Sequence, residues 1–155
     1  MASHLTVDHR ELWLGRAVRQ MRSYVKLHGL TLPPSIVIEV GETSISDGER
    51  VLGECYSSFF EPLHVPRIVI SNELVDPLRI LDVVIHELIH AADDGFSQHG
   101  EWFNGWAQAL GLVGSPGTVA GAALRKKLIP MARMLGPYPG PGIALVLDLE
   151  GRLVA

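Results

Sequence analysis

The segment His86-Glu87-Leu88-Ile89-His90 places two histidines and a glutamate at a spacing that suits metal-dependent hydrolysis. Residues four positions apart lie on one face of a helix, so both imidazoles can reach a single metal ion. Glu87 follows the first histidine and can act as general base for a water whose pKa the metal lowers towards about 7. The motif therefore predicts a catalytic zinc site with His86 and His90 as metal ligands and Glu87 as the catalytic residue.

A catalytic zinc needs a third protein ligand, and several residues after the motif are candidates. We favour His99, because a chain reversal at Gly95 would direct His99 back towards the motif. Glu101 is the second choice. Asp93 and Asp94 lie near the site but point past it, and they fit better as hydrogen-bond partners of the ligand histidines.

The spacing also excludes one class of zinc peptidases. The extended motif H-E-x-x-H-x-x-G-x-x-H requires glycine at position 93 and histidine at position 96. This chain has Asp93 and Phe96 at those positions.

The motif and its surroundings resemble the SprT-like family of zinc metallopeptidases. The resemblance is carried by the stretches His86–Ala92 and His99–Phe103, by Trp106, and by the strand-like stretch Ile68–Leu74 before the motif, and it covers roughly residues 12–111.

This resemblance implies a zincin-like peptidase core that holds one zinc ion with His86, His90 and His99 and uses Glu87 as acid and base. The family includes nuclear proteases that degrade proteins crosslinked to DNA, together with bacterial and phage members, so DNA-bound proteins are among the expected substrates. Many members carry a four-cysteine zinc ribbon after the core. The one cysteine here, Cys55, precedes the site, so no such ribbon is expected.

The elements that must position these residues predict a single α+β domain over residues 1–155. Strand-like runs at 36–40, 51–60 and 67–71 lie close together, which predicts a small, mostly antiparallel three-stranded sheet packed with the motif helix. Helices are expected from Asp8 to Gly29, from Asp76-Pro77 to Asp94, from His99 to Leu110, and from Ser115-Pro116 onwards with an interruption at Pro130.

Residues 136–155 are expected to form a Pro/Gly-rich linker followed by a short terminal strand or hairpin, with Ile143–Leu149 as the strand and a turn at Glu150-Gly151. Tyr138 lies in the linker, and its phenol is a candidate for stabilising the oxyanion formed in peptide hydrolysis. The alternative interpretation is an anchoring tyrosine in a proline-rich turn.

Three further features have structural interpretations. A glycine within a strand is typical of a β-bulge, so we expect one at Gly53. We expect Cys55 to be a small, buried hydrophobic residue. Trp102, Phe103 and the following apolar residues of their helix form a stripe that predicts packing onto the core rather than a substrate-binding wall.

Composition limits the class of protein. The chain has 155 residues, 47% of them hydrophobic and 19% charged, which excludes a disordered tail protein. One cysteine excludes an internal disulfide and a cysteine-only zinc site. The net charge of −4 does not indicate the strongly basic surface that is typical of nucleic-acid-binding proteins. Without a signal-like start or a long apolar run, we expect a cytoplasmic protein with no membrane partner.

These observations predict a zinc-dependent peptidase that acts on protein or peptide substrates. The alternative is a metal-containing DNA- or protein-binding module with little hydrolytic activity. Glu87 favours the enzyme, because a structural site needs a fourth protein ligand rather than a general base. Hydrolysis of another amide or an ester by the same chemistry is a third possibility.

Overall fold

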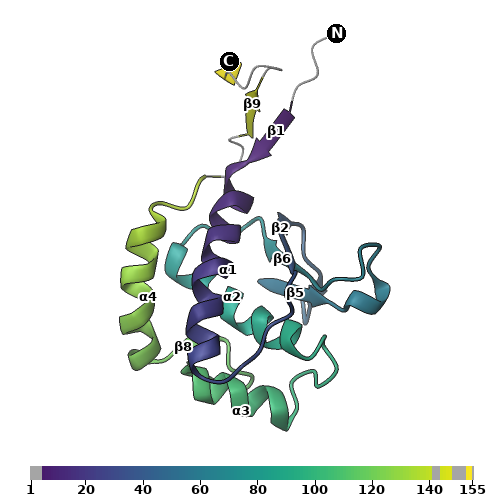
Figure 1. The fold of residues 1–155 in the computed structure, drawn as a ribbon, viewed down its shortest axis with the longest axis vertical. Helices are drawn as coiled ribbons and strands as arrows, with labels where there is room; N and C mark the ends of the chain where they lie inside the picture. Colours follow the sequence, from purple (N-terminus) through teal and green to yellow (C-terminus); the bar gives the residue numbers. More distant parts are fainter. Residues whose placement is uncertain (1–4, 141–143, 148–152, 155) are drawn as a thin grey trace.

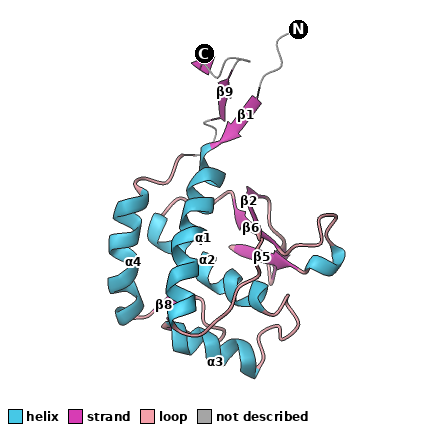
Figure 2. Cartoon of the chain, viewed as in Figure 1, coloured by secondary structure: helices cyan, strands magenta, loops and turns pink. Residues whose placement is uncertain are grey.

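The computed structural model describes residues 5–140, 144–147 and 153–154 (Figures 1 and 2). The described part is a mixed α+β structure with four α-helices and several small sheets. The elements are, in chain order, β1 (Leu5–Asp8), α1 (His9–Leu27), β2 (Val37–Gly41), β3 (Ile45–Ser46), β4 (Glu49–Arg50), β5 (Gly53–Tyr56), the 3₁₀ turn η1 (Ser58–Phe60), β6 (Arg67–Ser71), α2 (Pro77–Ala92), α3 (Glu101–Leu110), β7 (Leu112–Val113), β8 (Val119–Ala120), α4 (Ala122–Leu135), β9 (Ala144–Leu147) and β10 (Leu153–Val154).

Local capping explains where the two longest helices begin. The Asp8 carboxylate accepts a hydrogen bond from the Arg10 backbone N–H (2.9 Å), and the Asp76 carboxylate accepts one from the Leu78 N–H (3.1 Å). Pro77 occupies the first turn of α2, where a missing N–H costs nothing. The predicted starts of both helices, at Asp8 and at Asp76-Pro77, are therefore confirmed.

α2 is the central element of the fold. Nearly every residue from Ile80 to Ala91 is buried, because α2 packs against the β2–β6–β5 sheet and against α1, α3 and α4. Figure 1 shows α1 crossing α2, with α4 to the left, the sheet to the right and α3 below. The HExxH motif lies within this buried stretch, and His90 is its one residue that is partly exposed to solvent.

The sheet that packs against α2 has the strand order β2–β6–β5, with β6 in the middle. β5 pairs with β6 antiparallel, whereas β2 pairs with β6 parallel, from Val37↔Arg67 to Gly41↔Ser71. The expectation of a mostly antiparallel sheet is therefore wrong for one of its two strand pairs. The physical reason is the connection between β2 and β6, which contains the β3–β4 hairpin, β5 and η1 and is long enough to return the chain to its starting end.

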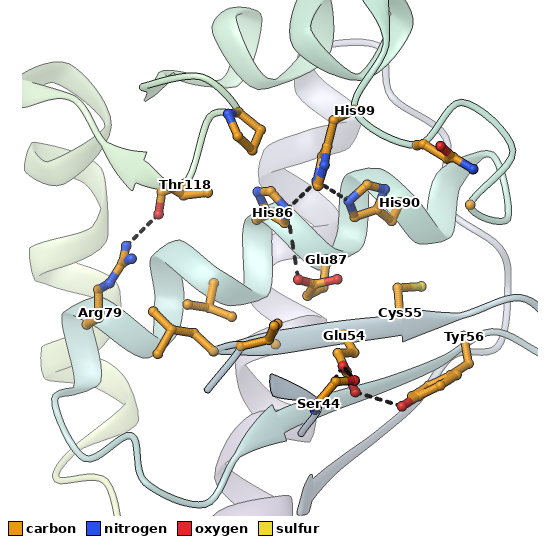
Figure 3. A pocket seen from close by; sticks show the side chains of 17 residues that line it. Ser44, Glu54, Cys55, Tyr56, Arg79, His86, Glu87, His90, His99 and Thr118 are labelled. Carbon is orange, nitrogen blue, oxygen red and sulfur yellow. Dashed lines mark hydrogen bonds and ion pairs between the residues drawn. The ribbon is translucent and has the colours of Figure 1, made fainter. Parts of the chain in front are cut away.

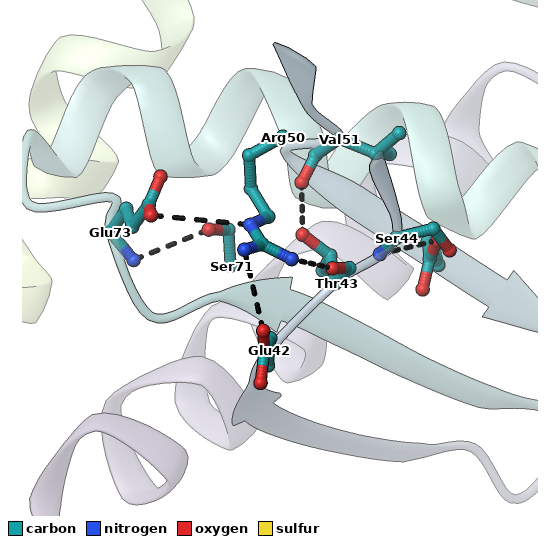
Figure 4. Close-up of polar contacts among 8 residues, drawn as sticks. Glu42, Thr43, Ser44, Arg50, Val51, Ser71 and Glu73 are labelled. Carbon is teal, nitrogen blue, oxygen red and sulfur yellow. Dashed lines mark hydrogen bonds and ion pairs between the residues drawn. The ribbon is translucent and has the colours of Figure 1, made fainter. Parts of the chain in front are cut away.

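The β3–β4 hairpin is tied to this sheet by polar contacts (Figure 4). The Arg50 guanidinium donates to the Thr43 carbonyl and pairs with the carboxylates of Glu42 (3.3 Å) and Glu73 (4.0 Å). The Thr43 hydroxyl donates to the Val51 carbonyl. These contacts hold the point where the chain enters β5.

The chain between α3 and α4 differs from the prediction. Instead of a helix starting at Ser115, β7 and β8 form a small antiparallel hairpin, and α4 begins only at Ala122. Gly114 adopts a positive φ of 101° at the turn, a conformation that favours a hairpin over a helix. α4 also continues through Pro130 instead of stopping there, because its apolar face, with Leu124, Leu128 and Leu135, is buried against the core.

A second three-stranded sheet joins the two ends of the described chain. β9 pairs antiparallel with both β1 and β10, so the predicted terminal strand and hairpin are present, while β1 is an element that the sequence analysis missed. The predicted turn at Glu150-Gly151 and the ends of the predicted strand at 143 and 148–149 lie outside the described residues. Within the described residues, the helices are all too short or too polar to cross a membrane.

Candidate metal centre

The HExxH motif lies on the last two turns of α2, and the chain reverses immediately after it. α2 ends at Ala92, and the Gly95 N–H donates to the His90 carbonyl (2.8 Å). Gly95 has a φ of 77°, which glycine adopts without a steric penalty. His99 lies in the loop just before α3 and faces the motif, as predicted (Figure 3).

Three imidazoles converge at this point. The His90 and His99 Nε2 atoms are 3.0 Å apart, and the His99 and His86 Nε2 atoms are 3.2 Å apart. Two nitrogen ligands 2.0–2.1 Å from a tetrahedral metal would lie roughly 3.3 Å apart. The three histidines are therefore close enough together to bind one metal ion.

The His86 ring has a defined orientation. Its Nδ1 lies 2.8 Å from the Gly117 carbonyl oxygen, which can only accept a hydrogen bond. Nδ1 must therefore carry the proton, and Nε2 has a free lone pair directed towards His99. A hydrogen bond of this kind from the outer ring nitrogen is typical of metal-bound histidine.

The side chain of Phe103, from α3, lies beneath the three imidazoles. Its ring stacks on His90 at 4.4 Å between centroids, and it meets His86 and His99 edge-on at 4.7 and 4.9 Å. Phe103 is fully buried, so this residue of the predicted stripe packs in the core and also supports the three imidazoles.

The pKa values of all three histidines are lowered, which favours neutral imidazole. Burial lowers the pKa of His90 to about 3, with further lowering from the neighbouring His86 and His99. Burial also lowers the pKa of His86, against the opposing hydrogen bond to Gly117, and it lowers the pKa of His99. Neutral imidazole is the form that binds a metal.

Glu87 faces the same space. Its Oε1 lies 3.9 Å from the His86 Nε2, and the residue is only 4% exposed. Burial raises the pKa of Glu87 to about 8, and the negative charge of Glu54 adds to this rise. In the metal-free protein, the burial of Glu87 therefore favours its neutral carboxyl form.

Gly53 explains how the sheet comes so close to Glu87. A Cβ at Gly53 would lie 2.5 Å from Val83 Cγ1 and 3.1 Å from Glu87 Cγ. The pairing of β5 with β6 runs without interruption from Gly53 to Tyr56, so the predicted bulge is absent. The glycine serves close packing between β5 and α2 instead.

A cleft of about 670 Å³ opens over these residues. β5 and the residues before it form one wall, the Pro116–Thr118 segment and Arg79 form the opposite wall, and the histidines with Glu87 lie between them (Figure 3). Cys55 lines the cleft, partly buried, and burial raises the pKa of its thiol to about 12.

The other predicted site residues lie elsewhere. Glu101 begins α3 with its side chain exposed, and it is outside the group that could hold a metal. Asp94 accepts two hydrogen bonds from Ser58, and Asp93 accepts one from the Ser97 N–H, so both stabilise the loop between α2 and His99.

Tyr138 is not brought to the cleft. It packs edge-on against Trp13 of α1, at 5.1 Å between ring centroids, and is buried there. Burial raises the pKa of its phenol to about 12. The structure therefore corrects the oxyanion role considered for Tyr138 and agrees with the alternative, an anchoring tyrosine.

Sequence reasoning missed the roles of Gly53 and Gly117 at this site. Gly117 is buried, and a Cβ there would lie 2.8 Å from the Ala107 Cβ. Neither glycine is near the motif in the sequence, and no local pattern marks a glycine that is needed for a close tertiary contact.

Comparisons of the chain with protein-family models, with curated proteins and with solved structures gave no match.

Proposed function

We propose that this protein is a zinc-dependent peptidase of the SprT-like type, in which His86, His90 and His99 hold the metal and Glu87 is the general base. The observation that carries the proposal is the convergence of three neutral imidazoles and one buried carboxyl group on the floor of a single cleft. Three protein ligands with a base nearby is the arrangement of a catalytic zinc site, whereas a structural site is closed by a fourth ligand.

In this proposal the metal ion, Glu87 and Phe103 have different roles. Zinc, when bound, supplies Lewis-acid polarisation and lowers the pKa of a water molecule. Glu87 accepts a proton from the attacking water and returns it to the departing amine nitrogen. Phe103 keeps the imidazoles in place by packing against all three rings.

The position of β5 favours a polypeptide substrate over a small amide or ester. β5 is an edge strand of its sheet, paired on one side with β6, and all four of its residues line the cleft beside Glu87. An extended peptide can pair with such an edge through main-chain hydrogen bonds. A scissile bond would then lie across the floor of the cleft.

The test combines metal analysis with cleavage assays. We expect the purified protein to bind one zinc ion per chain and to cleave an unfolded protein such as reduced casein, and a DNA-bound protein is assayed with and without its DNA. The Glu87→Gln variant should keep its zinc and lose at least about 10²–10⁴-fold in rate. Stoichiometric zinc without cleavage of any substrate would contradict the peptidase proposal and support the binding-module alternative.

A further inference from the structure

Three side chains on one face of α2 contact a single short segment of the chain, residues 117–120. Arg79, Asp82 and His86 are spaced i, i+3 and i+7, so their side chains emerge on the same side of the helix. All three reach the segment 117–120, which leads into and includes β8. His86 is the only one of the three that is also a candidate metal ligand.

The contacts follow one another along the segment. His86 Nδ1 donates to the Gly117 carbonyl at 2.8 Å, and Arg79 Nη1 donates to the next carbonyl, that of Thr118. The Ala120 backbone N–H faces the Asp82 carboxylate and opposes the rise in its pKa that burial causes. Arg79 Nη1 also lies 3.3 Å from Asp82 Oδ2, so the two side chains form one unit (Figure 3 shows Arg79 and Thr118).

We propose that Arg79 and Asp82 are positioning residues for the metal site: they hold segment 117–120 so that the Gly117 carbonyl fixes the His86 ring with Nε2 towards His90 and His99. This inference rests on metal binding by the three histidines, as in the proposed function. It does not require that the protein cleave peptides.

The energetic argument is that Asp82 is almost completely buried, with 4% of its surface exposed. A buried carboxylate is costly unless it is paired, and Arg79 is its partner. Loss of the Arg79 guanidinium would leave the Thr118 carbonyl and the Asp82 carboxylate without that donor. The segment would then have to move to satisfy them, and it would take the Gly117 carbonyl with it.

The test measures zinc affinity by competition with a chromophoric chelator. Arg79→Met should weaken zinc binding by about 10–100-fold, the range found for loss of outer hydrogen bonds around metal ligands. Arg79→Lys should bind zinc more tightly than Arg79→Met, because an ammonium can still donate to the carbonyl and pair with Asp82. In the metal-free protein, the NMR signal of the His86 Nδ1–H should weaken or shift in Arg79→Met.

Arg22→Met is the matched control. Arg22 is also a half-buried arginine that donates to loop carbonyls, those of Pro33 (2.7 Å) and Pro34 (3.3 Å), and it lies outside the cleft. This variant should keep wild-type zinc affinity. An equal loss in Arg22→Met and Arg79→Met would overturn the proposal, because the effect would then be general destabilisation.

A double-mutant cycle separates positioning from other effects. Since Arg79 acts through His86, Arg79→Met should cause no further loss of zinc affinity in a His86→Ala background. A loss that is fully additive, a wild-type affinity in Arg79→Met, or no advantage of lysine over methionine would each contradict the proposal. If the wild-type protein binds zinc but cleaves nothing, these affinities still decide the positioning role.

Discussion

Each histidine of the candidate site is held in place by a different part of the chain. His86 is oriented by the Gly117 carbonyl, His90 by stacking on Phe103, and His99 by the loop that Asp94 and Ser58 stabilise. The orientations of the three rings are therefore supported by contacts that do not involve a metal ion. Contacts of this kind reduce the ordering cost of metal binding.

His99→Ala tests the third ligand. We expect zinc affinity to fall by more than the roughly 10–100-fold that follows the loss of an outer hydrogen bond, because a direct ligand is removed. Glu101→Gln, which changes the second candidate from the sequence, should bind zinc as the wild type does. Isothermal titration with zinc measures both variants, and the reverse result would reassign the ligand to Glu101.

Glu87→Gln has a predicted effect on stability as well as on rate. The pKa of Glu87 is raised from 4.5 to about 8 in the folded, metal-free protein. Such a group contributes stability that is fully present below pH 4.5 and is lost as the pH rises towards 8. Glutamine has no charge to bury, so the variant should unfold at a higher temperature than the wild type by a margin that grows between pH 5 and pH 8.

Thermal unfolding in the presence of a chelator, at several pH values, measures this margin. Parallel curves for the two proteins across this pH range would contradict the raised pKa.

At the scale of the elements, the distance between β5 and α2 controls the site. The sheet can lie against Glu87 only because position 53 has no side chain. The same approach brings the edge of β5 alongside the cleft. The absence of a side chain at Gly53 thus brings the sheet edge and the Glu87 carboxyl group together.

Gly53→Ala should therefore damage both stability and activity. The new methyl group would overlap Val83 Cγ1 at 2.5 Å, and overpacking of this kind costs about 1–3 kcal/mol. Cleavage should fall further than stability alone explains, because β5 or Glu87 has to move. Denaturant unfolding and rates measured well below the unfolding temperature separate the two effects.

Gly105→Ala is the control for that change. Gly105 lies in α3 with open space around its Cβ position, so alanine should stabilise the helix by about 0.5–1 kcal/mol and leave the rate unchanged. A similar loss of activity in both variants would show that the close approach at Gly53 is not the cause.

At the scale of the whole molecule, α2 lies at the centre of the core and also carries most of the candidate site. The same helix contacts the sheet and the three other helices, and it contributes two of the three candidate metal ligands. Metal binding and global folding should therefore be coupled, because the unfolded chain cannot bring His99 to the other two histidines.

Zinc should raise the unfolding temperature in a concentration-dependent way. A ligand at 100 times its Kd adds about 2.7 kcal/mol, which corresponds to roughly 5–10 °C for a chain of this size. Scanning calorimetry with increasing zinc measures the shift, and His90→Ala should abolish it. A wild-type unfolding temperature that does not respond to zinc would contradict metal binding at the three histidines.

The sequence by itself determined those features that depend on local interactions. The starts of α1 and α2 follow from Asp8, Asp76 and Pro77, which cap their own helices. The spacing of the HExxH motif placed His86 and His90 on one helix face, and Gly95 marked the reversal that leads to His99. Strand β6 also lies at the predicted residues, because its apolar run is short and well bounded.

Only the tertiary structure decided the features that depend on distant parts of the chain. Two of these features are the parallel pairing of β2 with β6 and the close approach of Gly53 to Glu87. The other two are the hydrogen bond between His86 and the Gly117 carbonyl and the packing of Tyr138 against Trp13, away from the cleft. Each is a contact between residues more than 20 positions apart. Such contacts are determined by the packing of the whole core, because the local sequence is compatible with many arrangements. The candidate metal ligands can therefore be recognised from a local sequence pattern. The groups that orient and surround them are distant in the sequence and are identified only from the fold.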